Sequence, residues 1–80
     1  MDFQAIANKA KKMQNPEKFL TETCEELIQD CVENIKSGKE NYSNPKTKNL
    51  FNELKETCSG MGVNFPKFDF DRNLELELFS

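Results

Sequence analysis

The chain has 80 residues, a net charge of −3 at neutral pH, three cysteines and no histidine. A chain of this length forms one small domain that buries about 60% of its unfolded surface, so its core is marginal without a partner. The negative charge argues against generic binding to nucleic acid or to anionic membranes, because both require clustered positive charge.

The first predicted element is an amphipathic helix over residues 2–14. Asp2 is a typical N-cap residue, and the apolar side chains that follow it recur at helical spacing, so they form one narrow stripe. The stripe consists of Phe3, Ile6, Ala7, Ala10 and Met13. Asn15 and Pro16 then end this helix. They also begin the next one, because Asn caps helices and Pro suits the first helical position.

The second predicted helix covers residues 16–37 and ends at Gly38. Cys24 and Cys31 lie in the middle of its apolar sector, which indicates that both thiols are in the core. Seven residues of helix rise by about 10.5 Å, which exceeds the roughly 7 Å limit for a disulfide, so these two cysteines cannot be bridged to each other. A bridge from Cys58 is geometrically allowed, but an odd cysteine count without an export signal favours reduced, buried thiols.

The opposite side of the second helix is acidic. Its exposed stripe consists of Glu22, Glu26, Asp30 and Glu33. Like charges at i and i+4 are mildly destabilising unless positive charge lies near them. Three interpretations remain open: a solvated face, an intramolecular match with the lysines of the first helix, or a docking face for a basic partner, including a DNA-binding protein whose DNA the stripe would imitate.

The third predicted helix covers residues 45–59. Ser43, Asn44 and Pro45 repeat the cap pattern seen before the second helix. Apolar side chains at Leu50, Phe51, Leu54 and Cys58 then recur at helical spacing, and the helix stops before Gly60.

The C-terminal segment alternates apolar and acidic residues. Phe68 and Phe70 alternate with aspartates, and the leucines of LELEL alternate with glutamates beyond a short polar break. Alternation of this kind predicts two β-strands, hence a hairpin over residues 67–79. The predicted fold class is therefore α+β: three α-helices followed by a C-terminal antiparallel β-hairpin, in one domain spanning residues 1–80.

The last predicted strand has no later strand to cover it, which leaves an unpaired edge. We expect a second chain to pair there, most simply in a twofold homodimer. The partner or dimer edge would consist of Leu74, Leu76, Leu78 and Phe79. Glu75 and Glu77 argue the other way, because charged edge strands resist pairing.

The sequence offers little for catalysis or metal binding. Asp69, Asp71 and Asn73 form D-x-D-x-N, the opening of an EF-hand calcium loop. The match fails where the loop needs Gly and a bidentate Glu, because Leu74 and Ser80 stand there. The chain lacks histidine and a phosphate-binding glycine loop. We therefore expect no enzymatic activity, no metal and no cofactor.

These observations predict a small cytoplasmic protein, of a cell or host cell, that acts through protein–protein contacts as a regulator, inhibitor or assembly component. No apolar run is long enough for a membrane span, and phage and mobile elements encode many proteins of this kind. The alternative is a nucleic-acid binder that contacts phosphates, which fits less well because the chain has a single Arg to read bases. It would use Lys9, Lys11, Lys12, Lys46, Lys48 and Lys55.

Overall fold

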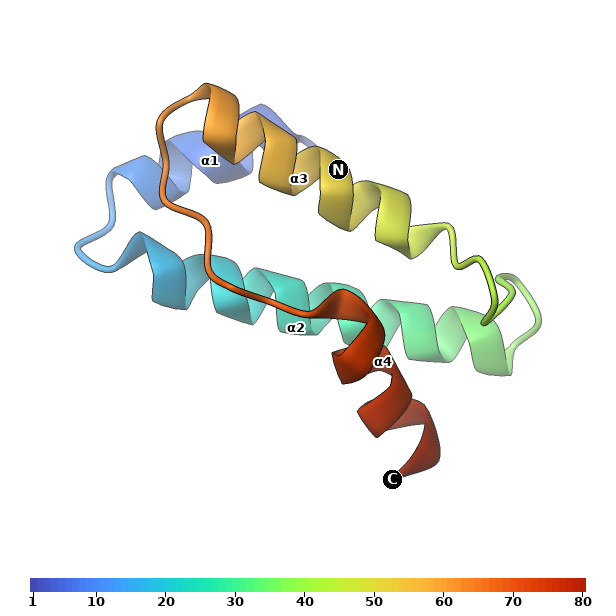
Figure 1. Ribbon diagram of the computed structural model, residues 1–80. Coiled ribbons are helices and arrows are strands. Elements are labelled where there is room, and N and C mark those ends of the chain that lie inside the picture. The colour runs from blue at the N-terminus through green and yellow to red at the C-terminus, as the bar shows by residue number, and fades with distance from the viewer.

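The computed structural model describes all 80 residues and contains four α-helices and no strand (Figure 1). The helices are α1 (Phe3–Lys11), α2 (Pro16–Lys36), α3 (Thr47–Gly60) and α4 (Phe70–Phe79). The three helices predicted before residue 61 are confirmed to within three residues at each end. The predicted hairpin over residues 67–79 is wrong, and the fold is all-helical rather than α+β.

The first two helices begin as their local sequences predict. The Asp2 carboxylate accepts a hydrogen bond from the backbone N–H of Ala5 at 3.1 Å, and the Asn15 side chain accepts one from the N–H of Lys18 at 3.1 Å. Both contacts satisfy backbone donors that have no partner within their helix. Gly38 follows the end of α2 with φ of 82°, a left-handed conformation that favours glycine.

The start of α3 differs from the prediction, because Ser43 and Asn44 do not cap it. The Glu40 carboxylate accepts hydrogen bonds from the backbone N–H and the hydroxyl of Thr47, each at 2.6 Å. It also accepts one at 2.6 Å from the amide of Asn34, near the end of α2. Glu40, seven residues before Thr47, therefore caps the start of α3 and links it by hydrogen bonds to α2.

The hydrogen bonds to Glu40 control its ionisation. Burial is the largest single influence and acts to raise the pKa of this carboxyl group. The side-chain donors of Thr47 and Asn34, with the backbone donors of Thr47 and Lys46, together outweigh burial and hold the pKa below its ordinary value. The ionised carboxylate is thus the form that the fold prefers.

The C-terminal segment forms a helix because its apolar residues also fit helical spacing. Asp69 is the N-cap, and its carboxylate accepts a hydrogen bond from the N–H of Arg72 at 3.1 Å. Phe70 and Leu74 are buried at i and i+4, and Leu78 at i+8 is partly buried against the core. Residues 65–80 contain no Val, Ile or Thr, whereas Leu, Glu and Arg are good helix formers.

Helix α2 is the centre of the molecule and contacts each of the other three helices, while α1 packs beside α3 (Figure 1). The segment between α3 and α4 has no regular structure beyond residue 62, and its aromatic side chains cover the core. Phe51 of α3 lies in the middle of this cluster, with ring centroids 5.8 Å from Phe65, 5.9 Å from Phe68 and 5.3 Å from Phe70. No helix combines the length and the apolar character that crossing a bilayer requires.

The predicted burial of the cysteines is confirmed. Cys24, Cys31 and Cys58 are all fully buried in the core, and all three thiols are free. Burial is the main cause that raises the pKa of each thiol, to about 12 for Cys24. The thiols are therefore protonated at neutral pH and behave as small apolar side chains.

Candidate functional site

The outer face of α4 points away from the core. Arg72, Leu76 and Phe79 stand at i, i+4 and i+7, so they share one side of the helix, opposite Phe70 and Leu74. Leu76 is 56% exposed and Phe79 is 70% exposed. Helix α4 thus buries Phe70 and Leu74 on one side and exposes Leu76 and Phe79 to solvent on the other.

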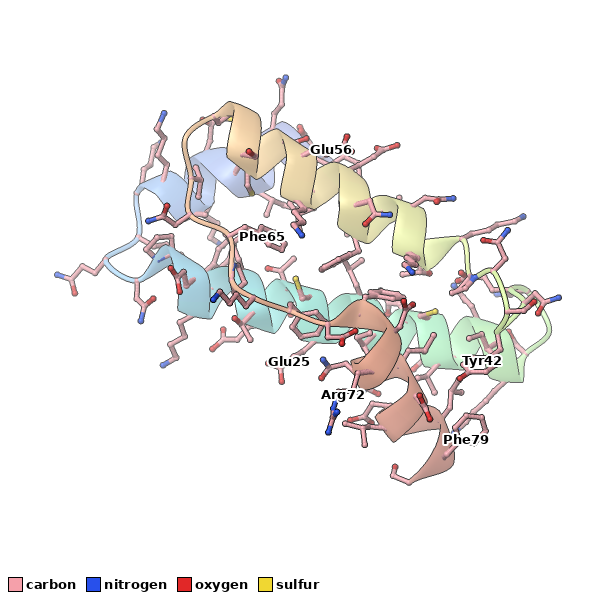
Figure 2. All side chains as sticks on the ribbon, in the orientation of Figure 1. Glu25, Tyr42, Glu56, Phe65, Arg72 and Phe79 are labelled. Carbon is pink, nitrogen blue, oxygen red and sulfur yellow. The ribbon has the colours of Figure 1, made fainter.

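A tyrosine from a different part of the chain extends this surface. Tyr42, in the loop between α2 and α3, meets Phe79 edge to face, with ring centroids 5.6 Å apart and an interplanar angle of 88° (Figure 2). Tyr42 is itself 44% exposed. We call Tyr42, Leu76 and Phe79 the α4 patch. It contains three of the six large hydrophobic side chains that the molecule exposes.

A shallow hollow of about 380 Å³ lies on this face, open to solvent. It is lined by Arg72, Glu75, Leu76, Phe79 and Ser80. Neither Arg72 nor Glu75 forms an ion pair, because the one ion pair in the molecule joins Lys48 and Asp71. The hollow therefore combines the apolar side chains of Leu76 and Phe79 with an unpaired cation and an unpaired anion.

The N-terminal end of α4 is firmly attached to the rest of the molecule. The ammonium of Lys48, on α3, lies 2.7 Å from the carboxylate of Asp71. Phe70 packs against Phe51 of α3, and Leu74 is fully buried. The C-terminal half of α4 projects beyond α2 (Figure 1). The patch thus stands at the end of α4 that projects from the molecule.

The four residues predicted as a strand edge separate on the helix. Leu74 is buried, Leu78 is partly buried, and only Leu76 and Phe79 are exposed. The prediction that a second chain pairs with this segment through strand hydrogen bonds is wrong. No strand exists, and the backbone groups of α4 form hydrogen bonds within their own helix. Two of the predicted contact residues nevertheless belong to the α4 patch.

The predicted acidic stripe of α2 is exposed along its length and makes no ion pair. Its members are Glu22, Glu26, Asp30 and Glu33. The match with lysines of the first helix was one of the three open interpretations, and no ion pair joins these lysines to the stripe. The ammonium of Lys9 lies instead over the ring of Phe19, 5.3 Å from its centroid. The stripe borders an open groove between α1 and α2 of about 360 Å³.

The lysines of the nucleic-acid alternative do not all remain free. Lys48 is paired with Asp71, and Lys9 packs over Phe19. The others are exposed, Lys11 and Lys12 at the end of α1 and Lys46 and Lys55 at or on α3. Nothing in their placement adds to the sequence-based argument for phosphate contact.

The structure contains no group of three or more Cys, Asp or Glu side chains placed to hold a metal ion. Comparison with protein-family models, with curated proteins and with solved structures finds no match to this chain. The α4 patch is therefore described from its own geometry.

Sequence reasoning missed two members of this site. The first is Arg72, which lies four residues before Leu76 and seven before Phe79. This spacing places the three side chains on one face of a helix, but the segment was predicted to be a β-hairpin. Tyr42 had no usable signal, because its contact with Phe79 joins two segments far apart in the chain.

Proposed function

We propose that this protein acts through protein–protein contacts, as a small regulator, inhibitor or assembly component, and that the α4 patch is its main contact surface. The observation that carries the proposal is the exposure of Leu76 and Phe79 on a helix whose opposite face is buried. An exposed apolar patch bordered by polar residues often marks a protein-interaction site.

The geometry of α4 favours insertion into a groove of the partner. Recognition of a helix in a groove uses side chains at i, i+4 and i+7, the spacing of Arg72, Leu76 and Phe79. A flat contact would bury little area, whereas stable interfaces bury about 800 Å² on each partner. A groove that wraps around the projecting end of α4 supplies more area from the same few residues.

The contact between Tyr42 and Phe79 supports this use of the surface. An edge-to-face pair restricts the ring of Phe79, so less rotamer freedom is lost when a partner binds. Aromatic side chains and arginine are also the residues that contribute most to binding energy at interfaces.

We also propose that the protein acts in the cytoplasm of a cell or host cell. The three free, buried cysteines support a reducing compartment, since extracellular domains of this size commonly depend on disulfides.

Capture from extracts of the source cell tests the proposal. The wild-type chain is compared with the double variant Leu76→Ser/Phe79→Ser and with the control Met13→Ser/Leu50→Ser, which removes two exposed apolar side chains elsewhere. We expect one protein to be retained by the wild type and the control but lost with the patch variant. Equal retention by all three would refute the proposal, and so would no specific retention by a chain that is also monomeric.

Sedimentation at tens of micromolar tests whether the partner is a second copy. Self-association that disappears in the Leu76→Ser/Phe79→Ser variant identifies the patch as a homodimer contact. A monomer under these conditions excludes the homodimer and leaves the patch as a contact for a different protein.

A further inference from the structure

A second surface lies in the groove between α1 and α2. Its apolar part is formed by Ile6 of α1 and Phe19 of α2, both partly buried, with Met1 at the rim. Its α2 wall carries the carboxylates of Glu22 and Glu26. The groove thus combines an apolar floor with one acidic wall.

The acidic wall continues beyond the groove. Asp30 and Glu33 extend it along the same exposed side of α2, so the carboxylates from Glu22 to Glu33 span about 16 Å of helix. None of the four is paired with a cation of this chain. Lys9 also lines the groove, but its ammonium is held over the Phe19 ring.

We infer that the α1–α2 groove binds a basic amphipathic helix of another protein. An apolar side chain of that helix would lie between Ile6 and Phe19. Its Lys or Arg residues, repeated once per turn, would face the acids of α2, because two helices packed side by side share a repeat of about 3.6 residues. This inference does not depend on the α4 patch.

Charge makes a second copy of this chain a poor occupant. The exposed apolar face that this chain could offer is that of α4, where Leu76 and Phe79 lie beside one cation, Arg72, and one anion, Glu75. One cation cannot match four carboxylates, and Glu75 would add repulsion, because like charges brought together at an interface are unfavourable. A helix with a cation on each turn neutralises the whole stripe.

The test uses a fluorescent synthetic peptide of about 18 residues, long enough to form a helix, with Leu and Phe on one face and Lys at one-turn spacing beside them. A matched peptide replaces each Lys with Glu. Fluorescence anisotropy with the full-length protein should show binding of the basic peptide, weakened by added salt, and no binding of the acidic peptide.

Two double variants locate the binding. Glu22→Lys/Glu26→Lys should lower the affinity for the basic peptide by about tenfold or more, since each attraction between charges becomes a repulsion. Glu53→Lys/Glu56→Lys makes the same charge change on exposed positions of α3 and should have less than a twofold effect. Leu76→Ser/Phe79→Ser should leave the affinity unchanged, which separates this inference from the function proposed for α4.

Three results would overturn the inference. No binding of the basic peptide at high micromolar protein would exclude the groove as its site. Equal binding of the acidic peptide would show apolar adsorption without charge recognition. Equal weakening by the α2 and α3 double variants would show a response to net charge rather than to this groove.

Discussion

The ring of Tyr42, in the loop after α2, rests edge to face on Phe79 at the far end of α4, with 5.6 Å between the centroids. The two rings belong to segments that are joined in sequence only through α3 and the aromatic segment after it. The contact therefore joins the projecting end of α4 to the loop after α2 and orients the ring of Phe79 within the α4 patch.

A double-mutant cycle measures this contact. Tyr42→Ala and Phe79→Ala, alone and combined, are compared by urea unfolding. We expect a coupling free energy near the lower end of the range for aromatic pairs, about 0.5 kcal/mol, because both rings are partly exposed. Tyr42→Phe should retain the coupling, since the ring contact needs no hydroxyl. Additivity of the two alanine substitutions would show that the rings do not interact in solution.

Leucine substitutions in α4 distinguish the helix from the predicted hairpin. In a strand, Leu74 and Leu76 would share one face, but in the helix Leu74 is buried and Leu76 is exposed. Leu74→Ala should therefore lower the free energy of unfolding by about 2–5 kcal/mol, whereas Leu76→Ala should change it by less than about 0.5 kcal/mol. Similar losses for the two substitutions in urea unfolding would contradict the helix.

The periodicity of the C-terminal segment fits both a helix and a strand. Phe70, Leu74 and Leu78 fit a period of four, and together with Phe68 and Leu76 they also fit a period of two. Periodicity in so short a run does not separate the two structures. The absence of β-branched residues and the capping position of Asp69 were the informative signals, and both favour a helix.

Glu40 should make folding stability sensitive to acid. The folded state lowers its pKa, so its carboxylate contributes stability above the ordinary glutamate pKa of about 4.3, and this contribution is lost as the pH falls through the folded-state pKa. Glu40→Gln should lower the free energy of unfolding at neutral pH by about 1–2 kcal/mol and should reduce the acid-induced loss.

Glu56→Gln is the matched control, because Glu56 is exposed on α3 and makes no ion pair. Urea unfolding at neutral and acidic pH measures both variants. The same pH dependence in Glu40→Gln as in the wild type would show that the hydrogen bonds to Asn34 and Thr47 do not stabilise the fold.

The sequence predicts the N-terminal caps of α1 and α2 but not that of α3. Asp2 and Asn15 were correctly predicted because a cap contacts a backbone N–H three residues along the chain. The cap of α3 could not be found in this way. Glu40 reaches Thr47 only because the loop between α2 and α3 folds back, and that fold depends on tertiary packing.

The cysteines should react slowly in the native protein. Burial raises the pKa of all three thiols, and the thiolate is the form that reacts. Labelling with a thiol reagent at neutral pH should therefore be slow for each cysteine and fast in denaturant. A thiol that reacts in the native protein as fast as a free cysteine would show that its helix face is wrongly placed.

Two substitutions at Cys31 separate its packing from its chemistry. Cys31→Ala should destabilise the fold modestly, because it leaves a small cavity. Cys31→Asp should prevent folding, since a buried charge without a partner costs far more than a cavity. Circular dichroism of the two variants measures the difference, and a folded Cys31→Asp variant would contradict the burial.

Site-specific photo-crosslinking in the source cell tests the function proposed for α4 most directly. A photoreactive amino acid is placed at position 79, in the α4 patch, and in a separate chain at position 56, on the exposed face of α3. We expect a discrete covalent adduct to another protein chain from position 79, lost when Leu76→Ser is added, and none from position 56. Equal adducts from both positions, or no adduct from position 79, would contradict it.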